Sequence, residues 1–161
     1  MPQLIDISTP TVLRSPLVQL TYVSARSANV LDDDVVELAI KSNIANRQAG
    51  INGCLWFGAR RFFQVLEGEQ DRVDRLYRKI KVDGRHTSVR LLSYSSIVSH
   101  QFARWNLAHV SHNEDSTIEK LILEYAGGEP GAPAEQPRSG ALQRILERLR
   151  AVLGQRPDSV M

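Results

Sequence analysis

The sequence predicts an α+β fold in which one sheet carries two helices on one face and a helical extension follows at the C-terminal end. Three observations support this class. Short runs with alternating or continuous apolar side chains, typical of strands, recur five times between residues 17 and 110. Two stretches with apolar residues at steps of three and four, typical of helices, separate these runs. Beyond residue 110 the apolar pattern is helical only.

The first predicted strand is Leu17–Ser24, with the sequence LVQLTYVS. Successive side chains of a strand alternate between faces, so Val18, Leu20 and Tyr22 share one face. Tyr22 is therefore expected to be buried, with a hydrogen-bond partner for its hydroxyl group.

The first predicted helix runs from residue 32 to about residue 47. Three aspartates at 32–34 supply N-cap candidates and acidic residues for its first turn. Its apolar stripe, which starts with Val36 and Ala39, ends in Asn43 and Asn46. These two amides either cap the helix end in solvent near Gly50 or form the rim of a polar pocket.

A β-hairpin is predicted from the runs Ile51–Phe57 and Phe62–Leu66, with Gly58 available for a positive φ in the turn. In the second run, Gln64 shares a face with large apolar side chains. A buried amide without partners costs about 1–3 kcal/mol, so its oxygen and NH2 group should be hydrogen-bonded. Either the backbone or a buried tyrosine satisfies it, or a polar ligand does.

The remaining elements complete the sheet. A second helix is predicted over 71–82 and ends at a turn with the sequence VDGRH, and strands follow at Val89–Val98 and Ala103–Val110. The last of these would place four side chains on one face, namely Ala103, Trp105, Leu107 and His109. The element order βαββαββ indicates a ferredoxin-like sheet with both helices on one face.

The predicted layout has five parts: an N-terminal arm (1–16), the sheet domain (17–110), an accessory helix (111–126), a flexible linker (127–140), and a C-terminal amphipathic helix with a tail (141–161). The apolar stripe of the final helix comprises Leu142, Ile145, Leu146, Leu149, Val152 and Leu153. It must pack on its own domain, on a second copy, on a partner or on a membrane surface, and the first two are favoured.

Composition excludes several functions. A net charge of +2 over 161 residues is too small to predict nucleic-acid binding. The single cysteine, Cys54, rules out a disulfide framework. There is no signal peptide and no apolar run of about 18 residues, so we expect a soluble cytoplasmic protein. No phosphate loop, metal-ligand spacing or nucleophile elbow is present, so the sequence does not predict an enzyme. In the same way, His86 is interpreted as part of a solvated turn and Glu67 as decoration of a strand end.

Buried polar groups on neighbouring strands and at the helix end suit a flat heteroaromatic ligand in an apolar slot. The motifs around them resemble the BLUF domain, a family of blue-light sensors that use FAD, over roughly residues 17–110. The resemblance rests on LTYVSA at 20–25, NRQAGINGCLWF at 46–57, FFQVLEG at 62–68, VDRLYRKIKVDGRH at 73–86 and FARWNL at 102–107.

The resemblance implies a set of cofactor-contacting residues: Tyr22, Asn46, Gln64, Lys79, Asp83, Arg85, His86 and Leu107. Of these, Tyr22 and Gln64 would form a hydrogen-bond chain to the flavin, and Trp105 would be a third photoactive residue. The chain departs from the family's usual pattern at Ala45 (commonly Asn), Asn52 (commonly Thr) and Leu107 (commonly Met).

The mechanism implied by the resemblance is a light-driven passage of an electron and a proton from Tyr22 through Gln64 and back. Gln64 is left rotated or tautomerised, and the flavin absorption is red-shifted. The output would be a separate effector, such as a cyclic-dinucleotide phosphodiesterase or a regulator, or altered self-association of a homo-oligomer. Removal of 127–161 would then leave the spectrum intact. The alternatives are a flavin-dependent redox enzyme and a flavin-free interaction module.

Overall fold

A computed structural model describes residues 15–127 and 140–156. Five strands form one sheet in the order β4-β1-β3-β2-β5. The elements are β1 (Leu17–Arg26), α1 (Asp32–Ala49), β2 (Asn52–Phe57), β3 (Arg61–Glu69), α2 (Gln70–Lys81), β4 (His86–Ser96), β5 (Ala108–Ser111), α3 (Ser116–Ala126) and α4 (Ala141–Gly154). The predicted α+β, ferredoxin-like architecture with a C-terminal helical extension is confirmed.

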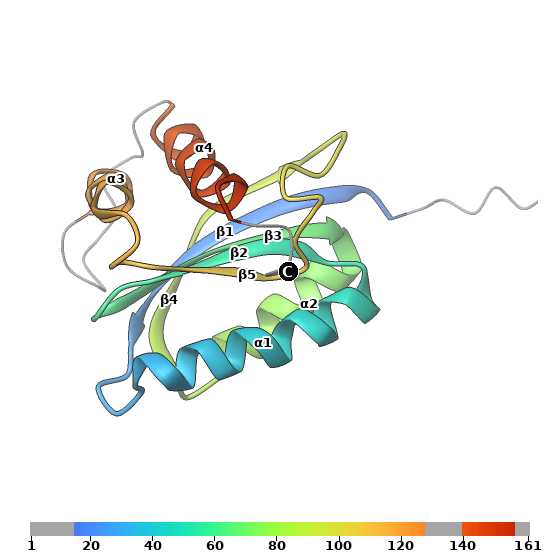
Figure 1. Ribbon diagram of the computed structural model, residues 1–161. Coiled ribbons are helices and arrows are strands. Elements are labelled where there is room, and N and C mark those ends of the chain that lie inside the picture. The colour runs from blue at the N-terminus through green and yellow to red at the C-terminus, as the bar shows by residue number, and fades with distance from the viewer. Residues whose placement is uncertain (1–14, 128–139, 157–161) are drawn as a thin grey trace, which may run out of the picture.

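The two faces of the sheet carry different helices (Figure 1). α1 and α2 cover one face, while α3 and α4 lie over the other. Strand parity assigns the side chains as predicted. Tyr22 and Leu66 belong to clusters on the α1 and α2 side, whereas Phe63 and Val65 pack in the cluster that contains α3 and α4. Tyr22 and the extension therefore lie on opposite faces of the sheet.

The extension is built as its apolar patterns predict. α3 buries Ile118, Ile122 and Tyr125, and α4 buries its stripe against the sheet of its own domain. Docking on the chain's own domain is therefore the outcome among the alternatives left open by the sequence. The predicted arm, most of the flexible linker and the end of the tail fall at 1–14, 128–139 and 157–161, outside the described residues.

The central hairpin forms with the expected antiparallel pairing of β2 and β3, but the expected role of Gly58 is wrong. Gly58 does not have a positive φ. Glycine is required there for space, because a Cβ atom would lie 2.7 Å from the indole ring of Trp56. The positive φ of this region occurs instead at Gly50, which has a φ of 68° and ends α1 in the left-handed conformation.

The start of α1 also differs from the prediction. The N-cap residue is Leu31, so none of the three aspartates occupies that position. Asp34 instead accepts a hydrogen bond from the Leu31 N–H (2.9 Å), and Asp32 pairs with Arg26 at 2.7 Å. All three carboxylates lie in the first helical turn, where the helix dipole favours them.

The predicted strand Ala103–Val110 is largely wrong. β5 comprises only Ala108–Ser111, and residues 97–107, here termed the β4–β5 connection, form turns and bends. Side chains replace the missing sheet pairing at the end of this connection. Asn52 donates to the carbonyls of Ala103 (3.2 Å) and Trp105 (3.3 Å). The alternating sequence therefore does not produce alternating faces here.

Candidate functional site

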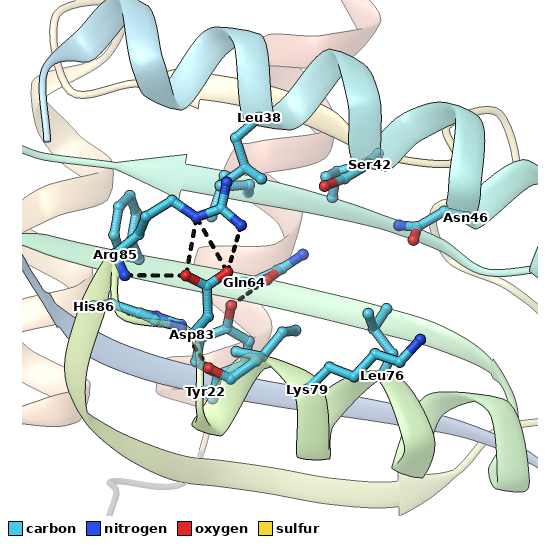
Figure 2. Close-up of a pocket in the computed structure, with 14 residues that line it drawn as sticks. Tyr22, Leu38, Ser42, Asn46, Gln64, Leu76, Lys79, Asp83, Arg85 and His86 are labelled. Atoms are coloured by element: carbon cyan, nitrogen blue, oxygen red, sulfur yellow. Dashed lines mark hydrogen bonds and ion pairs between the residues drawn. The ribbon is translucent and has the colours of Figure 1, made fainter.

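One pocket lies between α1, α2 and the sheet, on the face that carries Tyr22 (Figure 2). Its lining comes from six elements and the two loops that follow α2 and β4. The structure brings together at this pocket all eight residues named above as cofactor-contacting: Tyr22, Asn46, Gln64, Lys79, Asp83, Arg85, His86 and Leu107.

Tyr22 and Gln64 are neighbours in the register of β1 and β3, which places both side chains at the floor of the pocket. The Tyr22 hydroxyl donates a hydrogen bond to Gln64 Oε1. Burial raises the pKa of Tyr22 well above its ordinary value, and Tyr77 and Asp83 raise it further, so the phenol remains a donor at neutral pH.

The other end of the Gln64 amide faces the pocket (Figure 2). Because its oxygen is bonded to Tyr22, its NH2 group carries two donors for an acceptor within the cavity. No acceptor for this group is found among the described residues. The side chain is only 6 % exposed, so a carbonyl or ring nitrogen of a bound molecule would complete its hydrogen bonding.

His86 is fixed on both ring nitrogens. Its Nε2 lies 2.7 Å from the Ile80 carbonyl, which can only accept, so this nitrogen is the donor. In the neutral ring, Nδ1 then accepts from the Ser24 hydroxyl at 2.8 Å. His86 thereby links α2, β1 and β4 at the pocket wall. The interpretation of His86 as part of a solvated turn is wrong, because both of its ring nitrogens are bonded within the protein.

Charged side chains line the mouth of the pocket. Arg85 holds Asp83 through a two-pronged ion pair whose shortest distance is 2.6 Å (Figure 2). Hydrogen bonds from Arg85 lower the pKa of Asp83, even though partial burial acts against this. Lys79 is exposed on the same rim. Cationic groups at an otherwise apolar opening suit a ligand with an anionic end.

Of the two amides at the end of α1, Asn46 lines this pocket, and Asn43 borders a second hollow beside it. Asn46 is 4 % exposed and donates to the Asn106 carbonyl (3.0 Å), and Asn43 donates to the Leu107 carbonyl (3.2 Å). Of the two interpretations of these residues, the pocket rim is the one that the structure supports. The bond from Asn43 holds the backbone of Leu107, whose side chain lines the pocket and is 5 % exposed.

Trp105 does not line this pocket. Its ring packs on the opposite cluster, edge to face with Phe102, and it borders a second hollow between α1 and β5. The expectation that Trp105 and Leu107 share one face of a strand is therefore wrong. Leu107 lies between the two hollows and contributes to both.

Sequence reasoning missed six apolar or small residues of the pocket: Leu38, Ser42, Leu55, Phe62, Leu76 and Ile80. A signal for two of them existed. Leu38 and Ser42 precede Asn46 by eight and four residues, which places all three along one side of α1. Leu38 and Ser42 are both half-buried in the structure.

The fold and the pocket define a class of protein: a ferredoxin-like domain with a pocket suited to a small molecule that has polar edges. No cluster of three or more potential metal-ligating His, Cys, Asp or Glu side chains occurs among the described residues. Nor does any helix there offer the apolar length needed to cross a membrane. Comparison with known families narrows the class, because the family model described as sensors of blue light using FAD matches residues 17–108. The chain belongs to this BLUF family of blue-light flavin sensors.

Individual relatives agree with this assignment. The chain is 31% identical over 131 residues to the photoactivated adenylate cyclase subunit beta of Euglena gracilis. The aligned region covers 79% of this chain and 15% of that protein. The structure of BlsA in its photo-activated state matches with a TM-score of 0.70 and 30% identity, over 88% of this chain and 99% of that one. The dark-state structure of BlrB, a BLUF protein, also gives a TM-score of 0.70, with 25% identity over 86% and 98% of the two chains.

Proposed function

We propose that this chain is a blue-light receptor that binds FAD in the pocket between α1 and α2 and signals through a hydrogen-bond rearrangement at Tyr22 and Gln64. The observation that carries the proposal is the buried Tyr22–Gln64 hydrogen bond, with the Gln64 NH2 group directed into the cavity. The residues present fit a flavin, because the slot is apolar, amides line its walls, and cations lie at its mouth.

The positions of the binding residues support the roles that the family resemblance implies. Gln64 and Asn46 would hydrogen-bond the polar edges of the ring system, and Leu107 would cover it. Lys79, Arg85 and His86, with Asp83 orienting Arg85, would lie near the ribityl and phosphate groups. When bound, the flavin supplies blue-light absorption and a strong oxidant in its excited state.

The switch lies in the amide of Gln64. In the arrangement described here, Tyr22 donates to Oε1 and the NH2 group is left to donate to the ligand. Transient removal and return of the Tyr22 hydroxyl proton would allow the amide to rotate or tautomerise. The hydrogen bonds on both sides of Gln64 would then change, while the backbone of β3 stays paired. No substrate is consumed in this cycle.

We further propose that the output is a separate effector protein or a change in self-association as a homo-oligomer. The chain spans 15% of the length of the Euglena gracilis subunit and 10% of its Euglena longa counterpart, and both of these relatives are named as photoactivated adenylate cyclases. For light to act on a partner, the lit and dark states must bind it with different affinity. In this arrangement residues 17–110 sense light and the helices beyond residue 111 take part in the output.

The test is an absorption spectrum of the purified protein before and after blue light. We expect bound FAD whose absorption shifts to the red and recovers in darkness. Gln64→Leu should keep the flavin and lose the shift, and Tyr22→Phe should remain dark-like under illumination. Gln70→Leu, at the start of α2 and outside the pocket lining, is the control and should behave as wild type. A normal shift in the Gln64 variant would refute the mechanism, and bleaching of the flavin would indicate redox chemistry instead.

A further inference from the structure

Glu67 is a buried carboxylate that the proposed photochemistry does not use. It lies on β3 three residues after Gln64, on the opposite face of the sheet, and it is 0 % exposed. The interpretation of this residue as decoration of a strand end is wrong. No lysine, arginine or histidine among the described residues forms an ion pair with it, so its charge must be balanced by hydrogen-bond donors.

Three N–H donors converge on this carboxylate. The backbone N–H of Phe102 donates to Oε1 at 2.6 Å, and that of Gln101 donates to Oε2 at 2.9 Å. The side chain of Gln19 donates to the same Oε2 at 3.2 Å. Two of the three donors belong to the β4–β5 connection, so Glu67 bonds this connection to β3 with two charge-assisted hydrogen bonds.

These bonds determine where Trp105 lies. Phe102 is fully buried, its carbonyl accepts from the Trp105 N–H at 3.0 Å, and its ring meets the Trp105 indole edge to face. The Trp105 carbonyl in turn accepts from the Gly53 N–H of β2 at 3.0 Å. Glu67 therefore fixes the start of a short hydrogen-bonded turn that carries the Trp105 ring.

We propose that Glu67 is a positioning residue that couples β3 to the β4–β5 connection, so that a change at Gln64 is felt at Trp105 only while the Glu67 carboxylate holds Gln101 and Phe102. This rests on the proposed function for its light-dependent part. Its dark-state part, the seating of the connection by Glu67, requires no light. The pocket-lining residues lie on the other face, so loss of the carboxylate should leave the flavin site intact.

The substitution Glu67→Gln isolates the carboxylate. Gln has nearly the same shape but offers one acceptor oxygen, and its NH2 group would confront one of the two backbone N–H donors. Glu67→Asp keeps the charge but is shorter by one methylene. Glu69→Gln is the matched control, because Glu69 ends the same strand and pairs only with Arg72, at 3.5 Å, among the described residues.

The experiment uses the full-length, 15N-labelled, FAD-loaded protein, with amide hydrogen exchange measured in darkness and NMR spectra compared in darkness and under blue light. In Glu67→Gln we expect the Gln101 and Phe102 amides to exchange at least about tenfold faster than in wild type, because their charged acceptor is lost. The flavin red shift should persist, while the light-induced change at the Trp105 amide and indole resonances falls by at least about half. Glu67→Asp should lie between, and Glu69→Gln should match wild type.

Two results from the variants would overturn the proposal. Unchanged protection of Gln101 and Phe102 would show that Glu67 does not seat the connection. If the Gln101 and Phe102 amides lose protection but the light response at Trp105 stays complete, Glu67 has only a structural role and the coupling is refuted. If Glu67→Gln does not fold, Glu67→Asp is judged by the same two measurements. A wild-type protein without any red shift would refute the proposed function and the coupling, while the dark exchange data would still decide whether Glu67 seats the connection.

Discussion

The packing of α4 on the sheet can be tested by truncating one side chain. Leu149 lies in the middle of α4, is 0 % exposed and belongs to the cluster on the α3 and α4 side of the sheet. Leu149→Ala removes three carbon atoms, worth about 2.5 kcal/mol in transfer free energy. The void adds a cavity term, so the expected loss in the free energy of unfolding is about 3 kcal/mol within a usual range of about 2–5 kcal/mol.

Such a loss is large compared with a total domain stability of about 5–15 kcal/mol. It should lower the midpoint of thermal unfolding by about 6–12 °C in a chain of this length. Urea unfolding followed by far-ultraviolet circular dichroism measures the free energy directly. Arg144→Ala, on the exposed side of the same helix, is the control and should change it by no more than about 0.5 kcal/mol.

Equal stability of the two variants would refute the docking of α4 on its own domain.

The same packing changes an expectation drawn from the sequence, namely that removal of 127–161 leaves the flavin spectrum intact. Trp56 and Phe63 are fully buried in the cluster that α4 completes, and the deletion would uncover them. We therefore expect the deletion to reduce stability and flavin retention together, so single substitutions separate sensing from output more cleanly.

Two further substitutions probe the sheet and the extension. Gly53→Ala should prevent folding, because its Cβ would lie 2.0 Å from the Val65 carbonyl oxygen, whereas Gly84→Ala, with nothing within 4 Å, should fold normally by circular dichroism. Asp115 caps α3 and pairs with Arg148 of α4 at 2.7 Å, and these bonds lower its pKa although burial opposes them. Stability from a lowered carboxyl pKa is present above the ordinary value and lost as pH falls through the folded-state value. Asp115→Asn should therefore be less stable than wild type at pH 7, by up to about 1 kcal/mol. Urea titrations should show that this difference in the free energy of unfolding shrinks below about pH 4. A difference that stays constant with pH would exclude the charge as its cause.

Much of the pocket was predictable because strand periodicity is a strict local rule. A side chain at an even step along β1 must share a face with Tyr22, and the same rule places Gln64 among Phe62 and Leu66. The pairing of β1 with β3 then brings the two polar groups together. Helical spacing likewise placed Asn46 on the buried side of α1, since the apolar stripe that precedes it had to face the sheet.

The β4–β5 connection was not predictable from a local pattern. Residues 103–109 alternate as a strand would, yet side chains from distant elements form hydrogen bonds to the backbone of residues 101–107. Glu67 precedes Phe102 by 35 residues, and Asn43 precedes Leu107 by 64. No pattern within a window of about ten residues predicts such bonds. A buried acid and several asparagines on otherwise apolar elements were the available hint, because each must find a partner.

The geometry also limits how a change at Gln64 can reach α4. Side chains on opposite faces of a sheet do not touch, so the change must pass through the backbone of β3 or around an edge of the sheet. The β4–β5 connection reaches both faces: Leu107 covers the pocket, and Phe102 and Trp105 pack on the far side with α4. The connection is hydrogen-bonded to Glu67, which lies on β3 like Gln64 but has its side chain on the opposite face of the sheet. A rearranged amide that shifts β3 by a fraction of an ångström would therefore change two short, charged hydrogen bonds, whose energy depends steeply on distance. Apolar packing of Leu107 at the pocket has no comparable directionality, which is why the carboxylate is the more sensitive link of the two.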